Sequence, residues 1–132
     1  MSAKIEIIPG GGVTSPRGFS AGATSAGIKK TSDALDLSIL YSEVSSTAAA
    51  VFTKNKIKAA PVILDQQKLR RNGKVRAVVI NSGCANACTG KAGMENAAAM
   101  AEIAAGRLGV PAEEVLVAST GVIGLQLPVE NI

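Results

Sequence analysis

The sequence predicts an α/β fold, and three successive segments in its second half carry this prediction. Residues 75–80 (VRAVVI) are predicted to form a buried strand, and residues 115–118 a second one. Between them, residues 94–108 place apolar side chains at helical spacing. A strand, a helix and a further strand in this order are typical of layered α/β proteins. With 132 residues, the chain is long enough for one domain or for part of a larger one.

The first half of the chain is predicted to be less regular. Residues 9–27 are rich in Gly, Ser and Pro, so we expect a long loop with at most one irregular strand. Residues 37–41 and 49–53 are predicted as short strands that pair as a hairpin. Residues 61–65 are either another extended segment or the start of a short helix that runs toward Leu69. Asn72 and Gly73 predict a turn before the strand at 75–80.

In the second half, each predicted strand is followed by a loop of small residues. NSGCANACTG at 81–90 follows the first strand, and STGVIG at 119–124 forms a turn after the second. The intervening helix is predicted to bury one face and to end at Gly109 and Pro111. The residues on that face are Ala97, Met100, Ala101, Ala104 and Leu108.

Composition excludes several kinds of chemistry. The chain has no His and no Trp, 22 Ala and 14 Gly, and only three aromatic residues. Without His, this chain alone cannot build a Ser-His-Asp triad, a Cys-His pair or a zinc site with a His ligand. A nucleophile would need another base, such as the α-amino group of an N-terminal Thr, Ser or Cys exposed by cleavage. The three aromatics, Phe19, Tyr41 and Phe52, are too few for a surface that stacks oligonucleotide bases.

The net charge of +4 is unevenly distributed. Residues 1–76 carry 12 basic and 5 acidic groups, and residues 77–132 carry 2 and 5. A basic patch can attract nucleic acid, but no nucleic-acid motif accompanies these charges. We therefore expect a solvated surface or a contact with an acidic neighbouring subunit, and no nucleic-acid partner.

The cysteines and the hydropathy pattern indicate a cytoplasmic protein. Cys84 and Cys88 fit a reduced interior better than a disulfide framework, and their spacing is a poor metal signal. The first residues lack the apolar core of a signal peptide, and no apolar run approaches 18 residues. We expect no membrane association, no metal and no bound cofactor.

Two loops are candidates for a functional site. In STG, the hydroxyl of Thr120 and the N–H of Gly121 can both point at one oxygen, as an oxyanion hole requires. From spacing alone, an ordinary turn explains this string better. NSGCANACTG either binds a polar ligand or holds the STG loop, or else it is a tight connection into the helix, and both interpretations stay open. Glycines 10–12 lack the order of a phosphate-binding loop.

Five strings, in order, resemble one family. They are GGVTSPRGF (11–19), GIKK (27–30), AAVFTKNKIKAAPV (49–62), VVINSGCANACTG (78–90) and VLVASTGVIGLQLP (115–128). Together they are similar to the ornithine acetyltransferases of arginine biosynthesis, also called bifunctional glutamate N-acetyltransferase/amino-acid acetyltransferase. The resemblance runs from about residue 9 to the end. This chain has Cys84 where the commoner form of the fourth string has Asn.

The resemblance implies a layered sheet-and-helix fold and a precursor that cleaves itself into an α chain and a β chain. The β chain of such an enzyme begins with a Thr nucleophile, and the chains assemble as α2β2. The Thr takes the acetyl group of N-acetylornithine as an ester and passes it to glutamate; some members also accept acetyl-CoA as co-substrate. Residues 1–132 would be the N-terminal portion of the α-chain segment, an incomplete part of the fold that is inactive alone.

The family's oxyanion-hole Thr-Gly pair matches Thr120 and Gly121 in this sequence. The resemblance therefore implies that these two residues are the catalytic positions in this chain, while the nucleophile lies on the partner β chain. Two alternatives are an aminopeptidase of the same self-cleaving type and a non-catalytic α/β module that acts through binding or assembly.

Overall fold

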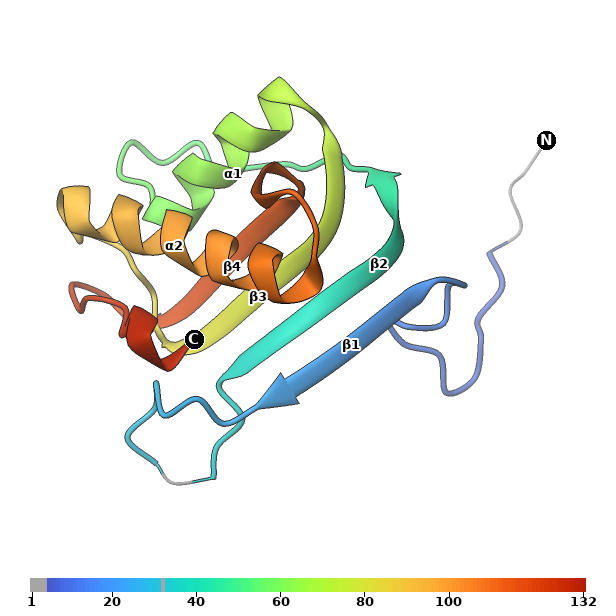
Figure 1. Cartoon of the computed structure of the whole chain (residues 1–132), viewed down its shortest axis with the longest axis horizontal. Helices are drawn as coiled ribbons and strands as arrows, with labels where there is room; N and C mark the ends of the chain where they lie inside the picture. Colours follow the sequence, from blue (N-terminus) through green and yellow to red (C-terminus); the bar gives the residue numbers. More distant parts are fainter. Residues whose placement is uncertain (1–4, 32) are drawn as a thin grey trace.

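The computed structural model describes residues 5–31 and 33–132, which form a mixed sheet covered on one face by two helices (Figure 1). The strands are β1 (Phe19–Thr24), β2 (Leu37–Thr47), β3 (Lys74–Cys84) and β4 (Val115–Val122). The helices are α1 (Ala60–Arg71) and α2 (Gly90–Leu108), with short 3-10 turns η1 (Ala112–Glu114) and η2 (Val129–Asn131). The predicted α/β class is confirmed. Residues 1–4, part of the stretch inspected for a signal peptide, lie outside the described residues.

The four strands lie in the order β1-β2-β3-β4. β2 is antiparallel to both β1 and β3, whereas β3 and β4 are parallel and are connected through α2. Parallel strands end at the same edge of a sheet. The loops after β3 and β4, which the sequence marks as candidate site loops, therefore lie side by side.

The core lies between the sheet and the two helices, mainly over β3 and β4 (Figure 1). Along β3, Val75, Ala77 and Val79 are buried and alternate with more exposed residues, as expected for a strand with one covered face. α2 contributes mostly small side chains to this core: Ala97, Met100, Ala101, Ala104 and Ala105. Because most of these side chains are methyl groups, the α2 backbone can pack close to the sheet.

The helix ends follow sequence signals. α1 begins with Pro61 in its first turn, where the missing N–H of proline costs no hydrogen bond. α2 ends at Gly109, which adopts a left-handed conformation (φ 65°) and donates its N–H to the Ala105 carbonyl. The predicted helix stop is confirmed, but α2 begins at Gly90, four residues before the predicted start.

Several predicted boundaries are wrong. Residues 49–53 form no strand, because both edges of β2 are already paired, with β1 and with β3. Within residues 9–27, expected as a long loop with at most one irregular strand, residues 19–24 form the regular strand β1. The open alternative at residues 61–65 resolves to helix, since they lie inside α1. β3 continues through residue 84 and β4 through residue 122, beyond their predicted ends.

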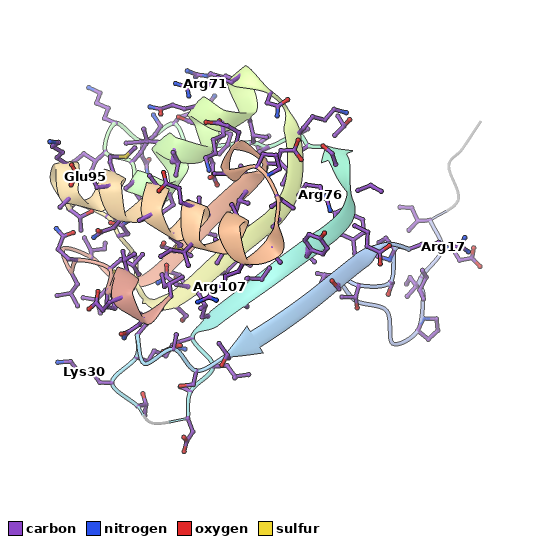
Figure 2. All side chains as sticks on the ribbon, in the orientation of Figure 1. Arg17, Lys30, Arg71, Arg76, Glu95 and Arg107 are labelled. Carbon is purple, nitrogen blue, oxygen red and sulfur yellow. The ribbon has the colours of Figure 1, made fainter. Side chains whose placement is uncertain are left out.

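The labelled charged side chains come from separate parts of the molecule (Figure 2). Figure 2 shows Arg17 and Lys30 near opposite ends of the molecule and Arg71 on α1. The ion pairs Arg71–Glu113 (3.9 Å) and Lys91–Glu95 (3.4 Å) are solvent-exposed, so each contributes little to stability. Neither described helix is long and apolar enough to cross a bilayer.

Candidate active site at the ends of β3 and β4

The two predicted site residues lie within β4, where it pairs with the end of β3. Thr120 lies opposite Ser82, and Gly121 lies opposite Gly83. Both predicted residues are exposed, and no hydrogen bond joins the Thr120 hydroxyl to another described side chain or backbone group. The sequence placed these residues in a turn; the structure places them on a strand, which holds a backbone donor more firmly than a turn does.

Gly121 is required at its position by close contact between the two strands. Its φ of 134° lies outside the range that residues with a side chain usually adopt. A Cβ atom here would lie 2.3 Å from the carbonyl carbon of Gly83 and 2.6 Å from the nitrogen of Cys84. The close approach and the unusual φ thus both depend on glycine.

The N–H of Gly121 belongs to the outer edge of β4. Successive N–H groups along a strand alternate in direction, and the N–H of Val117 points away from β3 because it donates to Asp65 on α1. Gly121 lies four residues further along, so its N–H falls in the same outward series. An exposed hydroxyl and an outward N–H on adjacent residues are the pair of donors that an oxyanion hole needs.

A short segment before β2 packs over the end of β3. A Cβ on Gly83 would lie 3.0 Å from Cγ of Lys29, so that segment comes close to the strand. The buried carboxylate of Asp36 holds it by accepting the N–H of Ala26 (2.6 Å) and of Lys29 (2.8 Å). The hydrogen bond from the Lys29 N–H, and to a smaller extent that from Ala26, lower the pKa of Asp36. The Asp36 carbonyl accepts the N–H of Ser82 (2.8 Å), which links the segment to the site.

Two buried side-chain oxygens beside the predicted residues have no hydrogen-bond partner among the described residues. They are Oδ1 of Asn81 and Oγ of Ser119, which lie opposite each other in the β3–β4 pair. Asn81 is fully buried and its amide donates to the Cys84 carbonyl at 2.8 Å. The interior directly before Thr120 and Gly121 is therefore polar, unlike the alanine-rich core further along the sheet.

The NSGCANACTG string both connects tightly into α2 and holds the segment that follows Gly121. Thr89 donates to Oδ1 of Asn86, and the Asn86 amide donates to the Gly93 carbonyl, both at 2.8 Å and both buried. This network makes a tight connection into α2. The same loop holds the segment after Gly121, because Ala85 donates to Val122 and Ala87 accepts from Gly124, each at 2.9 Å. These contacts favour the interpretations in which the string connects tightly into α2 and holds the segment after Gly121.

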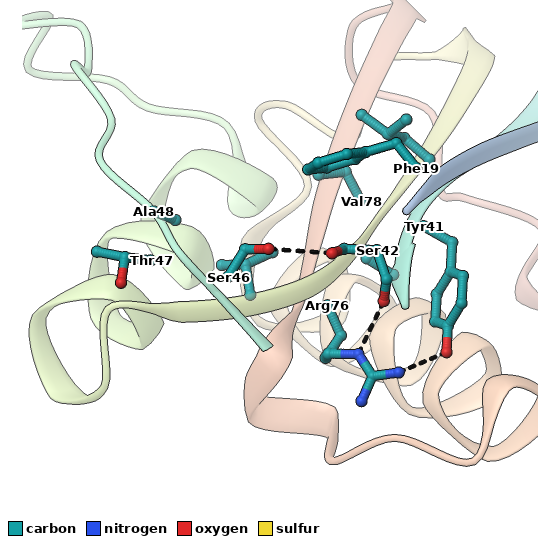
Figure 3. Close-up of a pocket in the computed structure, with 11 residues that line it drawn as sticks. Phe19, Tyr41, Ser42, Ser46, Thr47, Ala48, Arg76 and Val78 are labelled. Atoms are coloured by element: carbon teal, nitrogen blue, oxygen red, sulfur yellow. Dashed lines mark hydrogen bonds between the residues drawn. The ribbon is translucent and has the colours of Figure 1, made fainter. Parts of the chain in front are cut away.

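A hollow of about 180 Å³ at the other end of β3 is lined by Arg76, among other residues (Figure 3). Arg76 donates through Nε to the Ser42 carbonyl (2.8 Å) and through Nη2 to the Tyr41 hydroxyl, and its guanidinium lies 5.3 Å from the Tyr41 ring centre. The guanidinium thereby bridges β2 and β3 where the pairing register shifts between Tyr41 and Ser46. The arginine in the wall of this hollow makes structural contacts, and the hollow lies far along β3 from Thr120.

Sequence reasoning did not single out two residues that shape the site, Gly83 and Asp36. Gly83 has a φ of 109° and lies against Gly121, and its signal is the glycine within NSGC at the end of a predicted strand. Asp36 interrupts the apolar run around residues 35–40, a pattern that points to a buried and partnered carboxylate. The described residues include no cluster of three or more side chains suited to hold a metal ion.

The model of the ArgJ family matches residues 20–132. The chain belongs to the ArgJ family. It is 50% identical over its whole length to the arginine biosynthesis bifunctional protein ArgJ of Dehalococcoides mccartyi, and 54% identical over 89% of its length to that of Thermotoga neapolitana. These matches cover 33% and 29% of the two relatives, so the chain spans about a third of their length.

Solved structures of the family share this fold. The crystal structure of ArgJ from Bacillus halodurans matches with a TM-score of 0.89 and 42% identity, over 94% of this chain and 64% of that one. Ornithine acetyltransferase from Mycobacterium tuberculosis, solved in complex with ornithine, matches with a TM-score of 0.85 and 49% identity, over 91% of this chain and 64% of that one. The expected family and its sheet-and-helix fold are therefore confirmed.

Proposed function

We propose that this chain is the N-terminal portion of the α chain of a cytoplasmic acetyltransferase of arginine biosynthesis. The enzyme transfers the acetyl group of N-acetylornithine to glutamate through an acetylated Thr on a partner β chain, in an α2β2 assembly. Some members of the family are expected to accept acetyl-CoA as a co-substrate as well, and residues 1–132 alone are inactive. Support comes from the family membership and from the similarity to an ornithine acetyltransferase solved with ornithine.

The observation that carries the proposal is the pair of donors at the end of β4. In the proposed reaction, the Thr oxygen attacks the acetyl carbonyl carbon, and the electron pair of the C=O bond moves to its oxygen. The Thr120 hydroxyl and the Gly121 N–H donate to this oxyanion. The α-amino group of the Thr takes the proton of the attacking hydroxyl and, when the tetrahedral intermediate collapses and the C–N bond breaks, gives it to the amine of the leaving ornithine. The glutamate amine then attacks the acetyl ester, the C–O bond to the Thr breaks, and the Thr hydroxyl regains a proton from the amine through the same α-amino group.

The test is Thr120→Ala in the complete enzyme, with Thr120→Ser as the matched variant that keeps the hydroxyl. Loss of one oxyanion donor should lower kcat about 10²–10³-fold. The Ser variant should retain most of the turnover. The measurement is acetyl transfer from N-acetylornithine to glutamate, with peptide hydrolysis assayed in parallel. Unchanged kcat in the Ala variant would remove Thr120 from the mechanism, and peptide hydrolysis without acetyl transfer would favour an aminopeptidase.

A further inference from the structure

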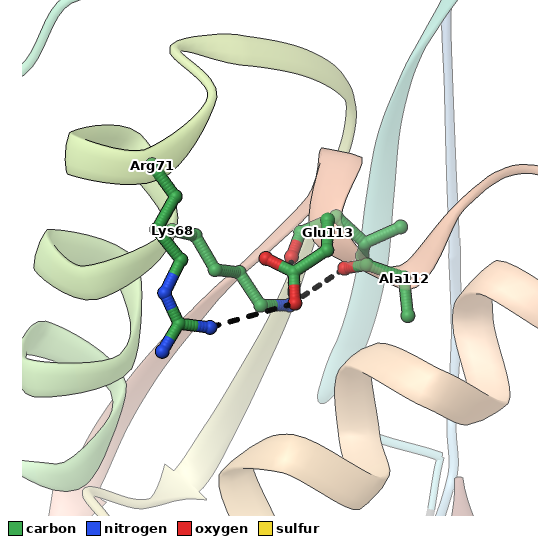
Figure 4. Close-up of polar contacts among 5 residues, drawn as sticks. Lys68, Arg71, Ala112 and Glu113 are labelled. Carbon is green, nitrogen blue, oxygen red and sulfur yellow. Dashed lines mark hydrogen bonds and ion pairs between the residues drawn. The ribbon is translucent and has the colours of Figure 1, made fainter.

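α1 hydrogen-bonds the edge of β4 that faces away from β3. Oδ1 of Asp65 accepts the N–H of Val117 at 3.0 Å, and Nζ of Lys68 donates to the carbonyl of Val115 at 2.7 Å. Lys68 also donates to the Ala112 carbonyl at 2.7 Å, in the turn that precedes β4 (Figure 4). Among the described residues β4 pairs with β3 alone, so these bonds take the place of a second neighbouring strand.

Burial disfavours the charged forms of both Asp65 and Lys68. Lys68 is only 7% exposed, and burial lowers its pKa, although the nearby charges of Glu113, Asp65 and Glu102 oppose this shift. Burial likewise raises the pKa of Asp65 to about 6, against the opposing effects of the Val117 N–H and of Lys68. Apolar side chains would fill a helix–strand contact without this desolvation penalty. Packing alone therefore does not explain why charged side chains hydrogen-bond the edge of β4.

The Val115 carbonyl and the Val117 N–H lie on the same edge of β4 as the N–H of Gly121, the proposed oxyanion donor. Val115 and Val117 present their outward backbone groups to α1, and continuing by twos along β4 leads to Ser119 and then to Gly121. Gly121 lies about 13 Å beyond Val117 at the usual rise per residue of a strand. A sliding or tilting of β4 at Val117 would carry to Gly121, since the strand is paired with β3 along this length.

We propose that Asp65 and Lys68 are positioning residues for acetyl transfer: they fix the edge of β4 so that Thr120 and Gly121 aim their donors at the acyl oxygen. The inference rests on the proposed function and extends it to α1. It separates the edge of β4 into two parts with different tasks. The part at residues 115–117 is tied to the helix, while the part at residues 119–121 stays available to a ligand.

The experiment compares three variants in the complete enzyme. Asp65→Leu keeps the approximate size of the side chain but removes the acceptor for Val117, whereas Asp65→Asn retains an oxygen acceptor. Gln67→Leu changes the exposed surface of the same helix and serves as control. Two quantities are measured: amide hydrogen exchange in residues 115–122, and kcat and KM for N-acetylornithine. Lys68→Met, which removes both carbonyl contacts, repeats the test if Asp65→Leu does not fold.

Asp65→Leu should speed amide exchange in β4 and lower kcat about tenfold, because small misplacements of catalytic groups are costly, while KM changes less than twofold. Asp65→Asn should retain at least about half of kcat, since its amide oxygen can still accept the Val117 N–H. Unchanged exchange in β4, or faster exchange with unchanged kcat, would overturn the positioning role. A wild-type enzyme without acetyl transfer would instead overturn the proposed function, and the exchange data would still show whether Asp65 holds β4.

Discussion

Replacing Gly121 with Ala tests the close packing on which the candidate site depends. The new methyl group would lie 2.3 Å from the Gly83 carbonyl carbon and 2.5 Å from its oxygen. These atoms belong to the backbone, so no side-chain rotation can relieve the overlap. Either β3 and β4 separate at their ends, or residue 121 leaves its φ of 134° and turns its N–H away from the site.

The size of the effect follows from two contributions. Holding a residue with a side chain in a rarely populated region of φ costs about 1–3 kcal/mol. Overpacking at the Gly83 contact adds about 1–3 kcal/mol, as in other tightly packed interiors. Together they predict a loss of about 2–6 kcal/mol in the free energy of unfolding. This is a large part of the roughly 5–15 kcal/mol that stabilises a typical domain.

The assay is denaturant unfolding of the complete enzyme, followed by acetyl-transfer kinetics on the variant that remains folded. Gly106→Ala is the matched control, because Gly106 is an exposed residue of α2 and a Cβ there meets nothing within 4 Å. That control should gain up to about 1 kcal/mol from the higher helix propensity of alanine. If Gly121→Ala is as stable and as active as the control, then the contact with Gly83 neither requires glycine nor shapes the site.

Two further predictions concern the polar contacts around the sheet. Burial raises the pKa of Asp65 from 3.8 to about 6, so the folded protein holds this proton more tightly than the unfolded chain, and the stability contributed by this group falls as the pH rises from about 4 to 6. This pKa shift corresponds to about 3 kcal/mol of free energy, which the partial exposure of Asp65 reduces to about 1–2 kcal/mol. Asp65→Asn should therefore raise the free energy of unfolding at pH 8 but not at pH 4. An equal change at both pH values would contradict this reasoning. A Cβ on Gly93 would lie 1.9 Å from Oγ1 of Thr89, so Gly93→Ala should reduce stability by about 2–4 kcal/mol. In thermal unfolding, the double variant Gly93→Ala/Thr89→Ala should be more stable than Gly93→Ala alone. If the double variant is less stable still, the clash with Thr89 is not the cause of the loss.

Local sequence signals predicted the second half of the fold better than the first. The helix stop at Gly109 and the buried strand around Val79 depend on neighbouring residues, so the sequence pattern is enough to predict them. The error at residues 49–53 has a nonlocal cause. Val51 and Phe52 favour a strand, but Val51 is 99% exposed, because β1 and β3 already occupy both edges of β2.

β1 was expected only as one irregular strand within a loop, for the complementary reason. Its sequence, FSAGAT, consists mainly of small residues with little preference for extended structure. Pairing with β2 from Phe19 to Thr24 supplies the missing stabilisation through backbone hydrogen bonds. Such a strand depends on its partner, and no inspection of residues 9–27 alone can reveal that partner.

The assignment of Thr120 and Gly121 as site residues stays a prediction, and the structure adds the setting of these residues. Thr120 and Gly121 were identified from the end of a predicted strand and from the family resemblance, and both lie at the joined ends of β3 and β4. What the sequence could not show is that Gly83 is the residue against Gly121, since 37 intervening residues separate them. The contribution of Asp65 was equally hidden, because it depends on how α1 packs along β4.

The abundance of small residues, first noted as a bare composition, has a specific consequence for this site. Gly121 is constrained on one side by backbone contact with Gly83, which any side chain would prevent. On the other side, Asp65 and Lys68 constrain β4 through hydrogen bonds to its backbone N–H and C=O groups. Both constraints act on the backbone, and the proposed donor at Gly121 is itself a backbone N–H. The backbone donor of the proposed pair therefore depends on where β4 lies, whereas the Thr120 hydroxyl also depends on its rotamer, and changes in packing far from Thr120 are expected to alter the proposed chemistry through the backbone.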